Sequence, residues 1–134
     1  MADELGLPLG NREKTYNSRL AQELSKWAES QAQGDAIHDA LFRAYFVDDL
    51  NIAETSVLIE VGESIGLPGE KIREVLETRA YREAVDLDWS RCRDLGIRAV
   101  PTFLFNGQAL VGAQSYANLS QFLEASNVNR RKPV

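Results

Sequence analysis

The segment from Ala99 to Gly107 constrains the fold more than any other part of the chain. Asn106 and Gly107 readily adopt a left-handed backbone, and apolar runs lie on either side of them at 102–105 and 109–112. Two such runs joined by Asn-Gly are typical of a tight antiparallel hairpin. This hairpin is the β element that we predict, and it lies in the last third of a chain of 134 residues.

Pro101 limits how the first of these strands can begin. Because proline has no N–H to donate to a sheet, we expect Pro101 at the first position of its strand, where a cis bond to Val100 is tolerated. Only about 5–6% of X–Pro bonds in folded proteins are cis. From local sequence alone, a trans proline that simply begins a strand is therefore the ordinary alternative.

The region before the hairpin has apolar residues at helical spacing, and cap and stop residues divide it into five helices. A further amphipathic helix follows the hairpin. The predicted boundary residues are Asn17 or Ser18 as the first N-cap, Gly34 as the first stop, Asp35 as the next cap, Glu54 at the third helix, Pro68 in the first turn of the fourth, Thr78 opening the longest helix, Gly96 ending it, and Ser115 capping the last.

Each predicted helix has an apolar face that we expect to be turned inward. In the second helix this face is broad and aromatic, and in the fifth and last helices it is narrower. From the first predicted helix to the last, these apolar faces include Leu24, Trp27 and Ala28; Ile37, Leu41, Phe42, Ala44 and Phe46; Leu58 and Val61; Ile72 and Leu76; Leu87 and Leu95; and Leu119, Phe122 and Leu123.

Charge and cysteine content exclude several classes of partner. A net charge of −5 and a pI near 4.9 disfavour a nucleic acid or an anionic membrane, because neither would gain electrostatically from contact with this chain. A single cysteine cannot form an internal disulfide or a thiolate metal site, which indicates a reducing compartment. No apolar run approaches the roughly 20 residues that span a membrane. We expect a cytoplasmic, soluble protein.

No single residue predicts catalytic or metal chemistry. Cys92 lies near the end of a predicted helix, where the helix dipole opposes a thiolate, so we expect it to be a small buried packing residue. His38 is alone, so we expect it on the surface of a helix. The acidic pairs 48–49 and 86/88 are typical of solvated faces. We therefore assign no catalytic residue, no metal ligand and no cofactor.

Val100-Pro101-Thr102-Phe103, followed by Asn106-Gly107, a short strand and a helix, resembles the second half of a thioredoxin fold. The helical stretch before it resembles the insertion of the DsbA-like proteins, most closely the FrnE-type branch related to the 2-hydroxychromene-2-carboxylate isomerases. Segments 16–24 and 79–85 also resemble that branch. The resemblance implies an α/β, mostly helical, thioredoxin-like fold made of a helical insertion, a cis-proline loop, a hairpin and a C-terminal helix.

The resemblance also implies a domain layout and shows that one family motif is absent from this sequence. The layout is a single partial DsbA-like domain, 1–134, with a remnant and linker at 1–16, the helical insertion at 17–96, the C-terminal half of the thioredoxin fold at 97–127 and a frayed basic tail at 128–134. Family members carry a Cys-x-x-Cys in an N-terminal β-α-β-α segment, and no Cys-x-x-Cys occurs here. We expect a truncated chain or a fragment of a longer one.

The family's activity is thiol–disulfide exchange, and the resemblance assigns substrate contacts to Val100, Pro101 and Thr102. Without the cysteine pair we expect the chain to be redox-inactive, with an extended polypeptide or a small thiol as the substrate of the site. The alternatives are a non-catalytic module that binds a peptide or protein, and a glutathione-linked isomerase-like protein. Because the strand at 102–106 would have an open edge, we also expect a homodimer through that edge.

Overall fold

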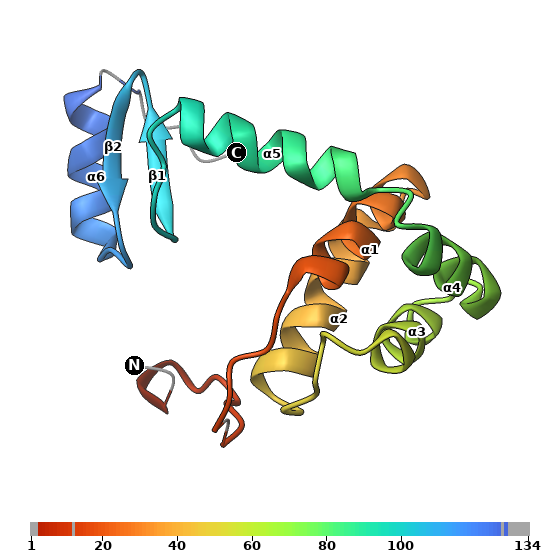
Figure 1. The fold of residues 1–134 in the computed structure, drawn as a ribbon. Helices are drawn as coiled ribbons and strands as arrows, with labels where there is room; N and C mark the ends of the chain where they lie inside the picture. The colour runs from red at the N-terminus through yellow and green to blue at the C-terminus, as the bar shows by residue number, and fades with distance from the viewer. Residues whose placement is uncertain (1–2, 12, 127, 129–134) are drawn as a thin grey trace. The chain divides into compact units, whose positions relative to one another are not determined.

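The computed structural model describes residues 3–11, 13–126 and 128. Within them a short 3₁₀ turn, η1 (Asp3–Leu5), precedes five helices, a hairpin and a sixth helix (Figure 1). The chain divides within α5 into two compact units, residues 1–88 and residues 89–134. The elements are α1 (Arg19–Ser30), α2 (Gly34–Phe46), α3 (Thr55–Ser64), α4 (Gly69–Thr78), α5 (Arg82–Asp94), β1 (Thr102–Phe105), β2 (Gln108–Val111) and α6 (Tyr116–Ala125).

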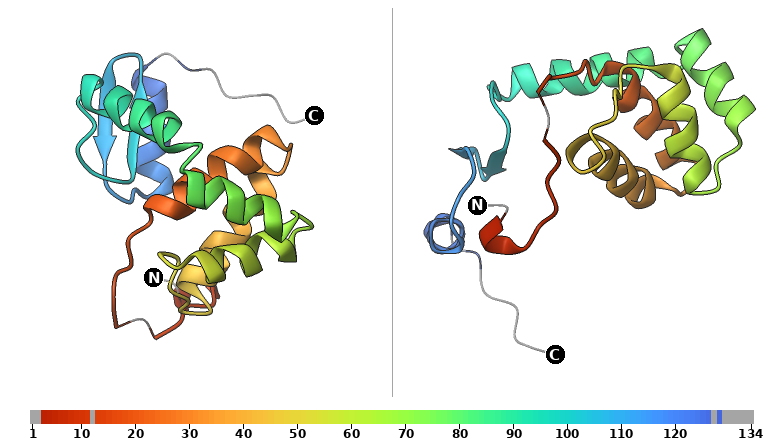
Figure 2. Two further views of the ribbon diagram at one scale, coloured as in Figure 1. Left: turned by 45° about the vertical axis from the view of Figure 1, so that its right-hand side comes forward. Right: turned by 90° about the horizontal axis from the view of Figure 1, so that it is seen from below.

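The first unit has a core made by four helices. Helix α1 packs against α2 and α4, and α3 packs against α2 and α4, as two further views show (Figure 2). Each of the four helices contributes at least one completely buried apolar side chain to the core, and the largest of these are Leu24, Ile37, Leu58 and Ile72. All four lie on the apolar faces predicted from the sequence, so the helical period was sufficient to find this core.

The broad aromatic face predicted for α2 is only partly correct. Ile37, Leu41 and Ala44 are buried, but Phe42 and Phe46 are 60% and 41% exposed. The two exposed rings instead form a row along the helix, with His38 stacked on Phe42 and Phe42 close to Phe46. A helix buries only the stripe that its neighbours cover, and here α1 and α3 cover the Ile37 side.

Two predicted helix boundaries are wrong, and both errors fall at a non-glycine residue in the left-handed conformation. Helix α1 ends at Ser30 because Ala32 takes φ 59° and the Gln33 N–H returns to the Ala28 carbonyl at 2.9 Å. Gly34, predicted as the stop, is the first residue of α2, and Asp35, predicted as its cap, lies inside the first turn because the N-cap is Gln33. Likewise α5 begins at Arg82 rather than near Thr78, since Arg79 takes φ 55° and separates α4 from α5. This later start leaves α5 with 13 residues, as many as α2, so it is not longer than every other helix as predicted.

The second unit contains the predicted hairpin. Strands β1 and β2 pair antiparallel with Thr102 opposite Val111 and Phe105 opposite Gln108. Asn106 and Gly107 turn the chain with φ 52° and 77°, as expected for a two-residue hairpin loop. Helix α6 lies beside the hairpin, and its predicted cap is confirmed by a 3.2 Å hydrogen bond that the Asn118 N–H donates to the Ser115 hydroxyl.

Among the described residues, none after Val85 is buried. The inward faces predicted for α5 and α6 are therefore incomplete: α5 buries Val85 but exposes Leu87 and Leu95, and Leu119 and Phe122 on α6 are only partly covered. The prediction of a buried Cys92 is wrong for the same reason, because the thiol is exposed. The predicted basic tail at 129–134 lies outside the described residues.

The expected fold class is confirmed. The described chain is mostly helical, and a two-stranded antiparallel hairpin and a C-terminal helix follow the helical region in the predicted order. None of the helices in the described segments has the length and apolar character needed to cross a membrane.

Candidate functional site

The candidate site is the loop that joins α5 to β1. Gly96 takes φ 72° and ends α5, and the Ile97 N–H closes the turn on the Cys92 carbonyl at 2.8 Å. The chain then passes through Val100, whose side chain is 91% exposed, and enters β1 through a cis Val100–Pro101 peptide bond. The residue two positions before β1 therefore exposes an apolar side chain to solvent.

Two hydrogen bonds fix the backbone at this entrance. The Thr102 hydroxyl donates to the Ala99 carbonyl across the proline, and the Gly112 N–H donates to the Pro101 carbonyl at 2.8 Å. The second bond continues the β1–β2 ladder by one pair beyond Thr102 and Val111. The loop is therefore held by both strands.

The same bond shows which backbone groups of β1 are used by β2. In an antiparallel ladder, opposed residues alternate between pairs that exchange hydrogen bonds and pairs that do not. Because Pro101 is bonded to Gly112, the bonded pairs that follow are Phe103 with Leu110 and Phe105 with Gln108. The N–H and C=O groups of Thr102 and Leu104 point to the opposite edge, where the described chain supplies no third strand.

His38 and the acidic pair 86/88 belong to the first unit and not to this loop. His38 is 45% exposed, and its Nε2 lies 3.6 Å from the Glu29 carboxylate. Asp86 accepts a hydrogen bond from Arg19, and Asp88 pairs with Lys26 at 2.7 Å. In the described segments, no group of three or more His, Cys, Asp or Glu side chains is arranged to hold a metal ion.

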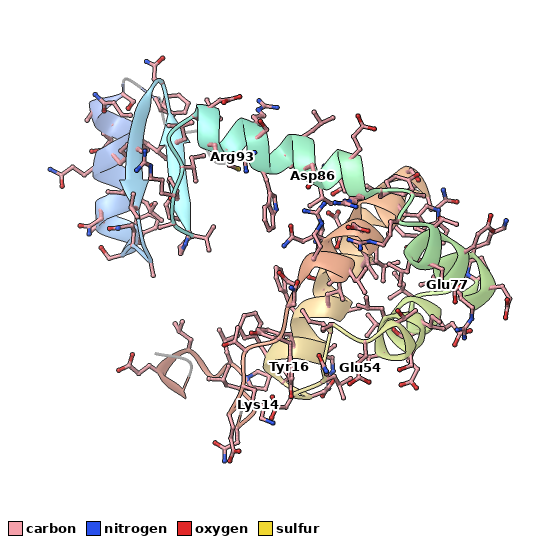
Figure 3. The ribbon with its side chains drawn as sticks, in the orientation of Figure 1. Lys14, Tyr16, Glu54, Glu77, Asp86 and Arg93 are labelled. Carbon is pink, nitrogen blue, oxygen red and sulfur yellow. The ribbon has the colours of Figure 1, made fainter. Side chains whose placement is uncertain are left out.

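A buried charge that the sequence analysis missed lies in the first unit. The Glu23 side chain is inaccessible to solvent and is bound by two guanidinium groups. Arg79 donates from Nε and Nη2 at 2.8 and 2.7 Å, and Arg19 donates from Nε at 2.9 Å. Arg19 also reaches the Arg82 carbonyl and Asp86, which is labelled on α5 in Figure 3.

These contacts shift the pKa values of Glu23, Arg79 and Arg19. The hydrogen bonds from Arg79 hold the pKa of the Glu23 carboxyl below its usual range, against the opposing effect of burial. The same bonds raise the pKa of Arg79, and the Glu23 and Asp86 carboxylates raise that of Arg19. The cluster ties α1 to the turn between α4 and α5, so it is a structural anchor of the helical unit.

The sequence contained only a weak signal for this anchor. Glu23 lies next to Leu24 in the apolar stripe of α1, and Arg19 is one turn before it. Arg79, the partner with two hydrogen bonds, lies 56 residues further along the chain. Helical spacing cannot reveal a pair of that kind.

The chain belongs to the DSBA-like thioredoxin domain family, whose model matches residues 1–124. Among solved structures, a probable DsbA oxidoreductase from Streptomyces coelicolor is similar to it with a TM-score of 0.83 and 25% sequence identity, over 99% of this chain and 59% of that one. An uncharacterized Bacillus subtilis protein, YwbO, is 29% identical over 116 residues, which are 84% of this chain and 58% of YwbO. The chain thus spans somewhat over half the length of these relatives.

Proposed function

We propose that this chain supplies the proline-loop half of a thiol–disulfide oxidoreductase site, with Val100, Pro101 and Thr102 as the residues that contact substrate. The observation that carries the proposal is the exposed strand entrance, where Val100 is directed at solvent and the outer backbone groups of Thr102 are unused by β2. Family membership and the DsbA oxidoreductase structure support the same class of activity. The substrate we propose is an extended polypeptide or a small thiol.

The proposed mode of binding is strand addition. An extended peptide placed along β1 can accept from and donate to the outward groups of Thr102, while the Val100 side chain contacts an apolar substrate residue. Backbone pairing of this kind gives affinity with little sequence preference, which suits an enzyme that acts on many disulfides. Pro101 lies immediately before β1, which begins at Thr102 rather than at the proline as predicted, and it has no N–H that could compete with the substrate backbone.

The chemistry itself requires two thiols. A thiolate attacks one sulfur of a disulfide, forms a mixed disulfide and expels the other sulfur as a thiolate; a second thiol then resolves the mixed disulfide. This chain has Cys92 alone, so the second step has no nucleophile. We propose that the 134-residue chain by itself is redox-inactive and that a cytoplasmic, reducing location suits its single thiol.

Reduction of insulin disulfides by dithiothreitol, with and without the purified chain, tests the redox part of the proposal. We expect the rate with the chain to equal that of the reductant alone, both for the native sequence and for Cys92→Ser. Turnover above that of the reductant alone that is present in the native chain and lost in Cys92→Ser would contradict redox inactivity, because the single thiol would then be carrying it.

Amide chemical shifts test the binding part. Titration with an uncharged extended peptide is expected to move the resonances of residues 99–103, and a Val100→Asp variant is expected to weaken binding several-fold by placing a charge in the apolar contact. Exposed Leu87 offers a matched control, since Leu87→Asp changes the same charge on α5 and is expected to leave binding unchanged. Shifts that avoid residues 99–103 for every peptide and for reduced glutathione would refute the site.

The second candidate function is a non-catalytic module that binds an extended peptide or protein. The same open edge of β1 favours it, because strand addition needs no cysteine. One measurement distinguishes the oxidoreductase from the binding module. If a longer form of the protein carrying a Cys-x-x-Cys reduces insulin, and its Val100→Asp variant does so with a raised KM, the oxidoreductase is supported over the module.

A further inference from the structure

Charged residues are distributed unevenly along this chain. Residues 1–88 include 18 acidic side chains and nine lysines and arginines, whereas residues 89–134 include two acidic side chains and six lysines and arginines. In the described part of the second unit the basic residues are Arg91, Arg93 and Arg98, and no charged residue follows them before Glu124. An acidic chain therefore has a local excess of positive charge immediately before β1.

The arginines of the two units also differ in their partners. In the first unit, every arginine that the structure describes lies 2.7–3.9 Å from a carboxylate oxygen, and these are Arg19, Arg43, Arg73, Arg79 and Arg82. In the second unit, the three described arginines are exposed, and none of them forms an ion pair with another described residue. Their guanidinium groups are free to bind a ligand.

Arg98 differs from the other two in its relation to α5. Arg91 and Arg93 lie in the last turn of that helix, where the helix dipole favours a positive charge. Arg98 comes after the turn that ends the helix, in which Gly96 takes φ 72° and the Ile97 N–H makes the closing hydrogen bond. Because the effect of the dipole falls off within the last turn, helix stability accounts for Arg91 and Arg93 but not for Arg98.

Arg98 belongs to the same loop as the candidate substrate contacts. It lies two residues before Val100, a separation of about 7 Å in an extended chain, which a long arginine side chain can cover. The backbone around it is fixed on both sides, by the Ile97 N–H bonded to α5 and by the Ala99 carbonyl bonded to the Thr102 hydroxyl. A substrate that contacts Val100 therefore brings its neighbouring residues within reach of this guanidinium group.

We propose that Arg98 is a specificity-determining residue, which binds a carboxylate of an extended polypeptide substrate close to the substrate residue that contacts Val100. This inference rests on the proposed function and narrows its substrate to polypeptides with an acidic side chain beside the bound segment. A guanidinium group can donate two parallel hydrogen bonds to one carboxylate, which a lysine ammonium group cannot do.

The net charge of the chain favours the opposite preference. At −5 it attracts a basic polypeptide and repels an acidic one over long distances. That attraction depends on the total charge of the partner and is screened by salt, whereas a contact with Arg98 depends on a single carboxylate in one place. The two effects therefore predict opposite orders of affinity for an acidic and a basic peptide.

Three short peptides with blocked ends separate these effects. Each has a central valine, with Glu, Gln or Lys two residues away on both sides, and binding is followed by the amide shifts of residues 99–103 in the 134-residue chain. We expect the Glu peptide to bind about 2–5-fold more tightly than the Gln peptide, as for an exposed ion pair. We expect the Lys peptide to bind least tightly.

Two matched substitutions test whether Arg98 is responsible. Arg98→Gln removes the charge and is expected to make the affinities of the Glu and Gln peptides equal, while Arg98→Lys is expected to keep part of the difference. Arg91→Gln makes the same change in net charge on α5 and is expected to leave the difference intact. All three side chains replaced are exposed, and unchanged amide shifts in the helical unit verify that each variant is folded.

Three results would overturn the proposal. Equal affinities for the Glu and Gln peptides, or tightest binding of the Lys peptide, would show that long-range charge alone acts. A preference for Glu that survives Arg98→Gln would place the carboxylate elsewhere. A preference lost equally in Arg91→Gln would not depend on position. The Gln peptide keeps the proposed function separate, since its binding at residues 99–103 tests the site and only the difference between peptides tests Arg98; failure of all three peptides to bind there would refute both.

Discussion

At the scale of single residues, Glu23 is the most constrained group in the helical unit. A carboxylate without solvent access is tolerated only when its oxygens are satisfied, and Arg79 and Arg19 together supply three N–H donors. Arg79 supplies two of the three hydrogen bonds to the Glu23 carboxylate, and Arg19 supplies one. Without Arg79, the buried charge would keep only the bond from Arg19.

Replacing Arg79 is therefore expected to destabilise the chain strongly. We expect Arg79→Met to lower the free energy of unfolding by about 3 kcal/mol, as for other buried pairs that lose one partner. Arg73→Met is the matched control on α4, since Arg73 and Glu77 form an exposed pair at 3.9 Å and should contribute under about 0.5 kcal/mol. Urea unfolding followed by circular dichroism measures both. Equal losses in the two variants would contradict the anchoring role of Arg79.

The cluster also predicts a pH dependence. Because the pKa of Glu23 is lower in the folded chain than in the unfolded one, the unfolded state binds more protons between the two values, and stability rises with pH across that interval. The contribution is complete above the ordinary glutamate pKa of about 4.3 and is lost as pH falls through the folded value. Glu23→Gln should remove it, so the stability difference between native chain and variant should shrink below about pH 4.3. A difference that stays constant from neutral to acid pH would exclude this linkage.

At the scale of elements, α3 and α4 approach closely at Gly62. A Cβ placed there would collide with Cδ1 of Ile72, a side chain with no solvent exposure. A buried isoleucine has little room to change rotamer, so an added methyl strains the contact.

We expect Gly62→Ala to cost about 1–2 kcal/mol, since overpacking outweighs the gain in helix propensity. Ile72→Val removes the colliding methyl and should cost about 1 kcal/mol in the native chain but less in the Gly62→Ala background. A double-mutant cycle by urea unfolding measures this coupling. Additive effects would show that the two sites do not touch.

Some of the helices, strands and turns could be predicted from the sequence. The hairpin, its Asn-Gly turn and the core faces of α1 to α4 followed from local pattern, because each depends on neighbours a few residues away. The end of α1 at Ala32 and the start of α5 after Arg79 did not, because non-glycine residues rarely take a left-handed backbone unless the surrounding structure stabilises it. The exposure of Phe42 and Leu87 depends on which neighbours cover a face, which periodicity does not report.

For the candidate site, proline's missing donor predicted a strand start at Pro101, and β1 begins one residue later at Thr102. The exposure of Val100 and the division of β1 into inward and outward backbone groups required the register with β2. Glu23 and Arg79 were beyond sequence reasoning, since nothing local brings together residues 56 positions apart.

At the scale of the whole molecule, the two units differ in how they reach stability. The unit 1–88 buries a contiguous core, whereas no described residue of 89–134 is buried. The candidate site lies in the unit with the less complete packing. Local stability there is expected to depend on what occupies the β1 edge.

The outward groups of Thr102 have a consequence for measurement, because a backbone amide bonded to a neighbouring strand exchanges its hydrogen slowly. A peptide that binds along β1 should therefore slow hydrogen exchange at the Thr102 amide and leave the Phe103 amide, already bonded to β2, unchanged. Unchanged exchange at Thr102 in peptide-saturated protein would show that the peptide binds another surface.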